Sequence, residues 1–417
     1  MSEIVVMKFG GTSVADAERI KRAARRIVDK RDSGARVVAV LSARGKTTDQ
    51  LIAMAEEVST APDPREMDML LSTGERISCA LCAMAIHDFG HEAISLTGSQ
   101  AGIVTDASHT RARIIDVRAD RISSALEEDR IVLVAGFQGV STDSSDVTTL
   151  GRGGSDTTAV AVAAALGAEE CEIYTDVSGV YTADPRIVPD ARKLSTISFE
   201  EMLEMAASGA GVLQLRSVEY ARNHGVRIHC RSSFDDEPGT VVLAEAETME
   251  QPLITAVTHS TSEARVTLVG VPDEPGAAAR IFQALAKVNV NVDMIVQNEP
   301  TSAGGLAEIS FTLPYEDLRV AHAALEPLAG VAFVDLDAQD EMGKVSIIGA
   351  GMRSHPGVAA KVFSVLAEEG VNIEMISTSP IKISCVIRSE HVPQAVRALH
   401  AAFELGEGGI EPEEGAR

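Results

Sequence analysis

The carboxy-terminal part of this chain contains two copies of one sequence pattern, and this repetition restricts the fold more than any other feature. ARVTLVGVPDEPGAAARIFQALAKVNVNVDMI is followed by GKVSIIGAGMRSHPGVAAKVFSVLAEEGVNIEMI, with the two Pro-Gly pairs 81 residues apart. Each copy reads as a strand, a turn, an amphipathic helix, a strand that opens with Asn, and a further strand. The repeat therefore predicts a small α+β sandwich used twice, and a dimerisation module without a ligand is the alternative.

Residues 4 to about 245 follow a different pattern, in which β-branched apolar runs alternate with helical segments. IVVMKF precedes the helical pattern ADAERIKRAARRIVDK and the strand pattern RVVAVLSA, and TTAVAVAAALGA later precedes CEIYTD. This alternation is typical of a three-layer α/β domain with a largely parallel sheet. At 417 residues the chain is long enough for two or three domains.

The charge balance narrows the possible partners. Acidic residues outnumber basic residues by 61 to 37, for a net charge of −24, which disfavours nucleic acid or an anionic membrane. No signal-peptide pattern and no uncharged apolar run of about 18 residues are found, so we expect a cytoplasmic protein. The five cysteines are scattered and odd in number, which argues against a disulfide framework.

One group of cysteines and histidines has metal-like spacing. Cys79, Cys82, His87 and His91 follow the pattern C-x2-C-x4-H-x3-H. They lie in a segment that reads as a long apolar helix ending near Gly90, where four side chains do not converge easily. We therefore expect structural packing here, and no metal held by the protein.

Glycine-containing segments carry the chemistry of the amino-terminal part. In VVMKFGGTSV, Lys8 precedes Gly10 and Gly11 at the end of a strand pattern. In TLGRGGSDTTA, glycines permit close backbone approach, the following helix start attracts anions, and Arg152 supplies a planar cation. SARGKTTD resembles the end of a Walker A loop, but Val40 stands where that loop requires glycine.

Carboxylates complete the pattern. Glu75 follows a glycine at a predicted helix start, where it also complements the helix dipole, and YTDVSGVYTADPRIV reads by itself as a long ordered turn. A lysine with a glycine pair, a glycine-rich loop with an arginine, and isolated carboxylates suit phosphoryl transfer by positioning and charge neutralisation. No consistent catalytic triad is present, which disfavours hydrolases.

The ordered motifs KFGGTSV, SARGKTTD, GERIS, TGSQAG, VAGFQG, TTLGRGGSDTTA and YTDVSGVYTADPR resemble those of aspartate kinases (aspartokinases) over essentially the whole chain. The duplication resembles the tandem ACT domains through which end-product amino acids control this family. The resemblance implies an amino-acid-kinase fold: a three-layer α/β/α domain with a mostly parallel sheet, followed by two ferredoxin-like α+β ACT domains. It places the catalytic domain at 1–247, a linker and first strand at 248–264, and ACT domains at 265–340 and 341–417.

The resemblance also implies the reaction and its residues. The γ-phosphoryl group of ATP, with Mg²⁺ carried by the nucleotide, would pass to the side-chain carboxylate of L-aspartate, giving 4-phospho-L-aspartate on the way to lysine, threonine and methionine. Lys8 would meet the phosphoryl group, Asp156 would orient Lys8, and Arg152 would grip a substrate carboxylate. Glu75 would bind the α-ammonium group, with Ser42, Thr48 and Ser155 completing the substrate pocket. The implied nucleotide contacts are Lys8, Phe9, Gly10, Gly11, Thr175, Asp176, Tyr181, Thr182, Asp184 and Arg186.

Regulation and assembly follow from the same resemblance. Lysine, threonine or both would bind the ACT repeats, at Asn291, Val292, Asp293, Gln297, Asn372, Ile373, Ser379 and Pro380. The expected assembly is a homo-oligomer, or an α2β2 complex whose small subunit arises from an internal start at Met249.

Several positions depart from the family's usual pattern. Gly211, in GAGVL, stands where relatives usually have a lysine that reaches the nucleotide, and Ser178 replaces a frequent Asp. We hypothesise that Arg44 or Lys46 supplies the missing charge.

The second repeat also departs from that pattern. Pro380 replaces a common Glu and removes an amide donor, and Ala359 stands where close relatives have Thr. We therefore expect altered feedback.

Two other interpretations stay open. One is another kinase of the same fold, acting on acetylglutamate, glutamate or UMP. The other is a catalytically weak protein that senses amino acids, an interpretation motivated by Gly211 and Ser178.

Overall fold

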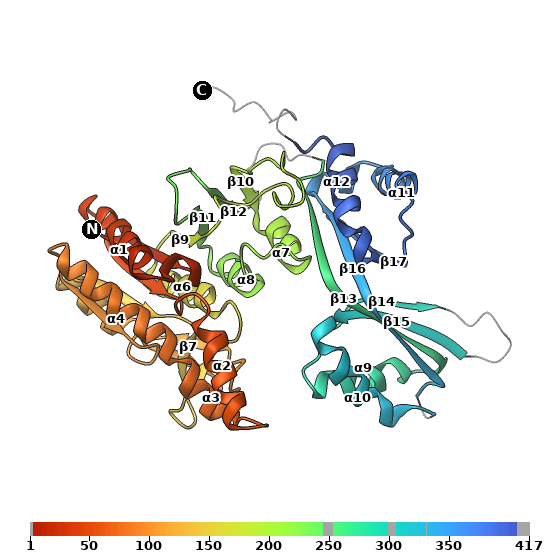
Figure 1. Cartoon of the computed structure of the whole chain (residues 1–417), viewed down its shortest axis with the longest axis horizontal. Helices are drawn as coiled ribbons and strands as arrows, with labels where there is room; N and C mark the ends of the chain where they lie inside the picture. The colour runs from red at the N-terminus through yellow and green to blue at the C-terminus, as the bar shows by residue number, and fades with distance from the viewer. Residues whose placement is uncertain (1–2, 245–252, 299–305, 331, 407–417) are drawn as a thin grey trace. The chain divides into compact units, whose positions relative to one another are not determined.

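The computed structural model describes residues 3–244, 253–298, 306–330 and 332–406, and the chain forms two compact units (Figure 1). The amino-terminal unit comprises residues 1–180, 193–207 and 211–249. The carboxy-terminal unit comprises residues 181–192, 208–210 and 250–417. Two short segments of the amino-terminal sequence therefore fold with the carboxy-terminal unit.

The amino-terminal unit is built on an eight-stranded sheet in the order β10-β12-β11-β9-β1-β2-β6-β3. Neighbouring strands are parallel except β11 and β12, which are antiparallel, so the predicted mostly parallel sheet is confirmed. The strands are β1 (Ile4–Phe9), β2 (Arg36–Leu41), β3 (Ala93–Leu96), β6 (Ile131–Ala135), β9 (Glu170–Thr175), β10 (Thr196–Ser198), β11 (Arg227–Ser232) and β12 (Thr240–Leu243).

A smaller sheet lies in the same unit, in the order β5-β4-β7-β8. Its strands are β4 (Ile103–Thr105), β5 (Ile114–Val117), β7 (Gln138–Ser141) and β8 (Val147–Thr149). The helices of this unit are α1 (Ala17–Asp32), α2 (Thr47–Val58), α3 (Pro64–Leu71), α4 (Thr73–Asp88), α5 (Asp120–Glu127), α6 (Gly154–Leu166), α7 (Phe199–Ala207) and α8 (Leu215–His224).

Alternation along β1 directs its side chains to two different layers. Val5, Met7 and Phe9 belong to the core shared with α1 and α4, which pack side by side (Figure 1). Lys8 points to the opposite face, where α6 packs. The strand thus carries an apolar face toward one layer and a single cation toward the other.

The consecutive helices α3 and α4 are, by length and composition, apolar enough to cross a membrane. Half of that apolar stretch (50%) is buried inside the protein. Cys79, Cys82 and Ile86 of α4 belong to the core between this helix and the large sheet. Core packing therefore accounts for the apolar sequence of α4.

The cysteine and histidine group has separate partners in the structure. Cys79 and Cys82 are buried in α4, and burial raises the pKa of the Cys82 thiol to about 12, against the thiolate that zinc requires. His87 Nε2 contacts the backbone at the start of β3, and His91 Nε2 lies 3.2 Å from Asp32 Oδ1. These four side chains therefore act in packing and hydrogen bonding.

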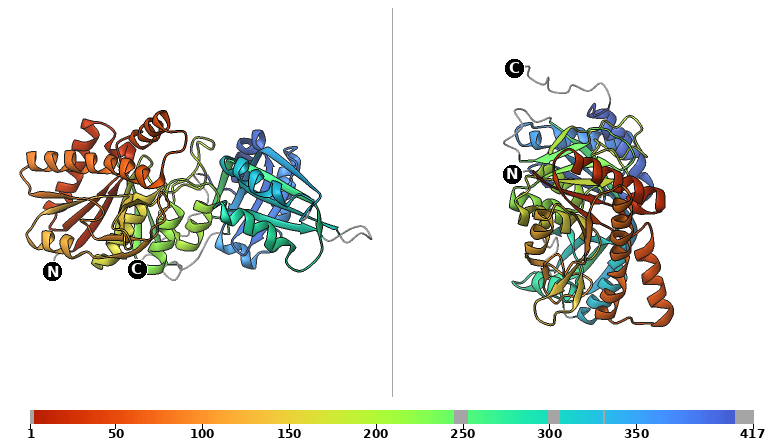
Figure 2. Two further views of the ribbon diagram at one scale, coloured as in Figure 1. Left: turned by 90° about the horizontal axis from the view of Figure 1, so that it is seen from below. Right: turned by 90° about the vertical axis from the view of Figure 1, so that its left-hand side faces the viewer.

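The carboxy-terminal unit contains a six-stranded antiparallel sheet in the order β14-β15-β13-β16-β18-β17, flanked by helices (Figure 2). The strands are β13 (Ala256–Pro272), β14 (Asp293–Asn298), β15 (Leu306–Pro314), β16 (Asp335–Ile348), β17 (Met375–Ser379) and β18 (Lys382–Arg388). The helices are α9 (Ala277–Lys287), α10 (Leu318–Leu325), α11 (Val358–Glu368) and α12 (Val392–Ala402).

The two long strands, β13 and β16, belong to both repeats. Residues 256–260 of β13 pair with the second half of β16, and residues 264–272 pair with β15 of the first repeat. The first repeat therefore has its four strands within its own continuous stretch, whereas the second repeat obtains its fourth strand, residues 256–260, from chain that precedes the first repeat. The predicted pair of α+β modules is confirmed, whereas the expected domain boundary at 247/248 and Met249 lie outside the described residues.

Candidate active site

Three strand ends meet at one edge of the large sheet. β1, β2 and β6 end at Phe9, Leu41 and Ala135. Ser42 N donates to the Phe9 carbonyl and Gly136 N to the Leu41 carbonyl, both at 3.1 Å. From β1 the sheet extends to β2 on one side and to β9, much later in the chain, on the other. Such switch points at the carboxyl ends of strands are where open α/β sheets bind ligands.

Lys8 and Asp156 form the charged centre of this edge. The Lys8 ammonium makes an ion pair with Asp156 Oδ1, in the first turn of α6, and the two side chains are only 11% and 8% exposed. A Cβ atom on Gly10 would lie 3.5 Å from Lys8 Nζ, an ordinary van der Waals contact, so this glycine adjoins the ammonium group. The structure thus brings Lys8, Gly10 and Asp156 together at the sheet edge.

The loop before α6 requires glycine at two positions. Gly151 and Gly153 have φ of 78° and 73°, and a Cβ on Gly153 would come within 2.0 Å of Gln214 Cγ. Ser155 is buried, whereas Arg152 is exposed, with no ion-pair partner found among the described residues. The loop therefore presents a cation beside the amino-terminal end of a helix, an arrangement that favours anions.

Glu75 is a buried carboxylate at the start of α4. Its Oε1 accepts a hydrogen bond from Ala43 N (3.1 Å), in the loop after β2, while Oε2 is buried without a partner within the described residues. Burial raises the pKa of Glu75 to about 7, although two backbone hydrogen bonds and Arg76 oppose this shift. Ser42 and Thr48, which flank the same loop, are half-buried. An orphaned buried carboxylate oxygen is suited to receive an ammonium group.

Phe9 contributes to this edge only through its backbone. Its ring is fully buried and stacks on Tyr174, with centroids 4.8 Å apart. Gly11 closely approaches the next loop, because a Cβ there would lie 2.9 Å from the Ala43 carbonyl oxygen. The carbonyl groups of both residues are already used, by Ser42 N and Gly45 N, so their contact with a nucleotide stays a prediction.

The positions that depart from the family pattern lie on the surface. Gly211 is exposed, and a Cβ placed on it meets no atom within 4 Å. Arg44 Nη2 donates to the Ala15 carbonyl (3.2 Å), whereas Lys46 is exposed at the start of α2. Ser178 Oγ donates to Asp235 Oδ2 (2.9 Å). Of the two candidate replacement cations, Lys46 is the more accessible.

The predicted nucleotide residues fall into two structural groups. Thr175 and Asp176, at the end of β9, belong to the amino-terminal unit, together with Lys8 and the residues that follow it. Tyr181, Thr182, Asp184 and Arg186 fold with the carboxy-terminal unit. The sequence pattern showed one continuous loop and contained no sign of this division.

Asp184 and Arg186 form a forked ion pair. Arg186 Nε and Nη2 donate to the two Asp184 oxygens at 2.7 to 3.1 Å. The hydrogen bonds from Arg186 lower the pKa of Asp184, against its partial burial. The Arg186 side chain is nevertheless 90% exposed.

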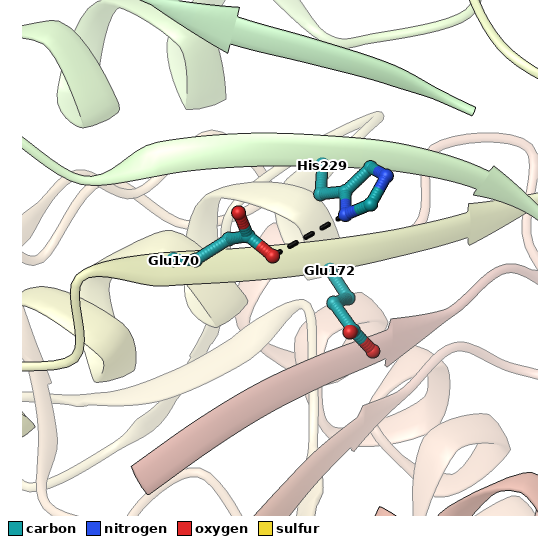
Figure 3. A group of neighbouring side chains, drawn as sticks. All are labelled: Glu170, Glu172 and His229. Carbon is teal, nitrogen blue, oxygen red and sulfur yellow. Dashed lines mark hydrogen bonds and ion pairs between the residues drawn. The ribbon is translucent and has the colours of Figure 1, made fainter. Parts of the chain in front are cut away.

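Glu170, Glu172 and His229 form a group with metal-like geometry on neighbouring strands β9 and β11 (Figure 3). His229 Nδ1 lies 3.3 Å from Glu170 Oε1, and Nε2 lies 2.6 Å from the Pro238 carbonyl oxygen. Both partners are acceptors, so both ring nitrogens donate, and the bond to Glu170 raises the pKa of His229. Glu172 Oε1 pairs with Lys30 Nζ at 2.6 Å. The group is therefore an ion-pair network, because a doubly protonated ring cannot bind a metal.

The predicted effector residues occupy equivalent places in the two repeats. Asn291 and Val292 lie just before β14, which begins at Asp293, and Asn372 and Ile373 lie just before β17. The other three are Gln297 in β14, Ser379 at the end of β17, and Pro380 in the turn that leads to β18.

Two ion pairs join the repeats reciprocally. Arg265 of the first repeat binds Glu374 of the second (Nη1–Oε2 2.9 Å), and Lys344 of the second binds Asp293 of the first (Nζ–Oδ2 2.7 Å). The two cations occupy equivalent positions in the repeated sequence, as do the two carboxylates. Sequence reasoning missed Arg265, Lys344 and Glu374, although their matched positions were visible, because the pattern does not show that the pairs cross between repeats.

Three family models match the chain. The amino acid kinase family matches residues 3–232, and two ACT domain models match residues 265–332 and 345–403. The aspartokinase of Mycolicibacterium smegmatis is 58% identical over 406 residues, covering 97% of this chain and 96% of that protein. The aspartokinase of Corynebacterium glutamicum is 52% identical over 406 residues, with coverage of 97% and 96%.

Solved structures agree with these relatives. E. coli aspartokinase III in complex with aspartate and ADP has a TM-score of 0.83 and 28% identity, covering 96% of this chain and 99% of that one. The same enzyme in complex with lysine and aspartate has a TM-score of 0.74 and 29% identity, with coverage of 96% and 100%.

Proposed function

Because this chain belongs to the amino acid kinase family, and within it to the aspartokinases, we propose that the sheet edge around Lys8 is its catalytic site. An aspartokinase is an ATP-dependent kinase that phosphorylates the side-chain carboxylate of L-aspartate to 4-phospho-L-aspartate. The observation that carries the assignment is the buried Lys8–Asp156 pair, which lies at the carboxyl ends of parallel strands and the start of α6.

The proposed role of Lys8 is to meet the phosphoryl group during transfer. Negative charge is spread over the phosphoryl oxygens in the transition state, and a fixed cation stabilises it without reorganisation. Asp156 holds the Lys8 ammonium in place, and the main chain of Gly10 and Gly11 lines its approach. Mg²⁺ would neutralise charge on the ATP phosphates. We propose that it arrives with the nucleotide, because Mg²⁺ usually binds substrate phosphates with only one or two protein carboxylates.

The substrate would be held at both ends. Glu75 Oε2, buried and unpartnered, is proposed to receive the α-ammonium group of aspartate, and exposed Arg152 to bind a carboxylate in a two-pronged contact. Ser42, Thr48 and Ser155 complete this pocket. For ATP we propose the backbone of residues 8–11 with Thr175 and Asp176 in the amino-terminal unit, and Tyr181, Asp184 and Arg186 in the carboxy-terminal unit. The complex of E. coli aspartokinase III with aspartate and ADP supports the binding of these two classes of ligand.

A hydroxamate assay with ATP, Mg²⁺ and hydroxylamine tests the role of Lys8. We expect Lys8→Ala to lose about 10²- to 10³-fold in kcat, the range seen when one charge-stabilising group is removed, and Lys8→Arg to lose less. Equal hydroxamate formation by Lys8→Ala and the unchanged protein would contradict the role. Aspartate, glutamate and acetylglutamate are compared in the same assay, because a preference for either of the other acceptors would contradict the pocket assignment.

Regulation by amino acids is the second part of the proposal. The chain carries two ACT modules, and E. coli aspartokinase III has been solved with lysine bound. We propose that lysine, threonine or both bind near the starts of β14 and β17, with feedback weakened by Pro380 and Ala359. Complete inhibition of the purified enzyme by modest concentrations of lysine plus threonine would refute the weakening.

Assembly and location complete the proposal. We propose a cytoplasmic protein that forms a homo-oligomer or an α2β2 complex whose small subunit begins at Met249. Expression of the gene with and without Met249→Leu distinguishes these two assemblies. A short polypeptide that co-purifies with the unchanged chain and disappears in the variant supports the α2β2 form, and its absence from both supports the homo-oligomer.

A further inference from the structure

Both ends of the segment Tyr181–Arg192 continue into the amino-terminal unit, yet the segment folds with the carboxy-terminal unit. Ala183, Val188 and Ala191 of this segment are buried in the core that contains α11, α12 and strands of the second repeat. Ala191 also forms an isolated antiparallel bridge with Gly406. Packing against the second repeat therefore determines the conformation of this segment, which carries predicted nucleotide contacts.

Thr182 is the polar anchor of the segment. The residue is completely buried, and its carbonyl accepts a hydrogen bond from Val257 N of β13 at 2.8 Å. Its hydroxyl donates to the Leu405 carbonyl (3.0 Å) and accepts from Arg192 N (3.0 Å), and His400 Nε2 lies 2.9 Å away. The single hydroxyl proton is used by Leu405, so His400 Nε2 must donate. All hydrogen-bonding capacity of the Thr182 hydroxyl is thus used inside the unit, and none remains for a nucleotide.

His400 lies on the buried face of α12 and is only 1% exposed. Burial lowers the pKa of His400, and Arg192 lowers it further while Asp190 opposes the shift. The ring is therefore neutral at pH 7, with its one proton on Nε2, as the hydrogen bond to Thr182 requires. Loss of this donor would leave an acceptor site of a fully buried hydroxyl unsatisfied.

We propose that His400 is a positioning residue for the nucleotide: through Thr182 it fixes the segment that carries Asp184 and Arg186, and so makes ATP affinity depend on the fold of the second repeat. The inference rests on the proposed function, specifically on the nucleotide contacts assigned to Asp184 and Arg186. Thr182 then fixes the segment from inside the carboxy-terminal unit and does not touch the nucleotide. The effector residues near β17 belong to the same repeat, so an effector that shifts α12 changes the nucleotide segment directly.

The test uses the full-length enzyme with three variants of α12. His400→Leu removes the donor, His400→Gln restores an amide donor near the position of Nε2, and Arg397→Leu changes an exposed residue of the same helix. We expect His400→Leu to raise the KM for ATP and the calorimetric Kd for ADP by about fivefold or more, the factor expected for one lost hydrogen bond. The KM for aspartate should stay within about twofold, with His400→Gln and Arg397→Leu close to the unchanged enzyme.

Two outcomes overturn the proposal: ADP affinity unchanged in a folded His400→Leu, or equal increases in both KM values. If His400→Leu does not fold, Thr182→Val and Thr182→Ser provide the same comparison, because only serine keeps the hydroxyl. Arg186→Gln tests the proposed function separately. Unchanged ADP affinity in Arg186→Gln removes the nucleotide role of the segment, whereas weaker binding there with no effect of His400→Leu refutes only the positioning role.

Discussion

At the scale of single residues, we expect the burial of Glu75 to affect both the free energy of unfolding and the binding of aspartate. Its folded-state pKa of about 7 lies above the ordinary value of 4.5, so its contribution to stability is fully present below pH 4.5 and is lost as the pH rises through 7. We expect Glu75→Gln to be more stable than the unchanged protein at pH 8, by up to about 3 kcal/mol, and nearly equal to it at pH 4. Denaturant unfolding at the two pH values measures this difference, and a gain of equal size at both would contradict it.

The ionised form of Glu75, which burial disfavours, is the form that we expect to bind aspartate. Only ionised Glu75 attracts an ammonium group, so the Kd for aspartate should fall as the pH rises from 6 toward 8 in the unchanged protein. Glu75→Gln should bind aspartate about tenfold or more weakly at pH 8, because a charge-assisted hydrogen bond is lost. Calorimetric titrations at both pH values test this, and a pH-independent Kd in the unchanged protein would be inconsistent with the role.

Gly211 offers a gain-of-function test at the residue scale. The position is exposed and a side chain would find open space there, so Gly211→Lys should fold without strain. We expect the added cation to lower the KM for ATP severalfold at low ionic strength, with Gly211→Gln as the uncharged control. If both variants change the KM equally, the effect does not come from charge, and the hypothesis that a lysine is missing here fails.

At the scale of elements, the buried ion pair between Glu263 and Lys344 joins the long strands β13 and β16. Lys344 lies in the middle of the sheet, where burial disfavours its charge, but Glu263 and Asp293 outweigh this and raise its pKa. Lys344→Met would leave the buried Glu263 carboxylate unpaired, and we expect it to destabilise the carboxy-terminal unit by about 3 kcal/mol. Arg280→Met, which breaks the exposed pair with Glu274, is the matched control and should cost less than about 1 kcal/mol. Equal losses in chemical denaturation would show that burial does not decide the cost.

At the scale of the whole molecule, the net charge of −24 opposes compaction. Salt screens this repulsion, since the Debye length falls from about 30 Å at 0.01 M to about 10 Å at 0.1 M ionic strength. We expect the melting temperature to rise between these two salt concentrations, similarly in NaCl and KCl. A rise with only one of the two salts would instead indicate a specific cation site.

The sequence by itself was sufficient for the architecture and for the charged centre of the site. The alternation of apolar runs predicted a parallel sheet, and the repeat predicted paired α+β modules, because both are local periodicities of burial. The resemblance to aspartate kinases implied that Asp156 orients Lys8, and the structure places the two in an ion pair. The roles of the individual site residues remain predictions.

Only the tertiary structure decided which parts of the chain belong together. The 181–192 segment lies within the amino-terminal sequence but folds with the carboxy-terminal unit, and its anchor, Thr182, meets His400 across 218 positions of sequence. Likewise, Arg265 pairs with Glu374 of the other repeat and not with its own copy's Asp293. Local patterns report which side chains need burial or a partner. Which distant group satisfies that need depends on the packing of the complete fold.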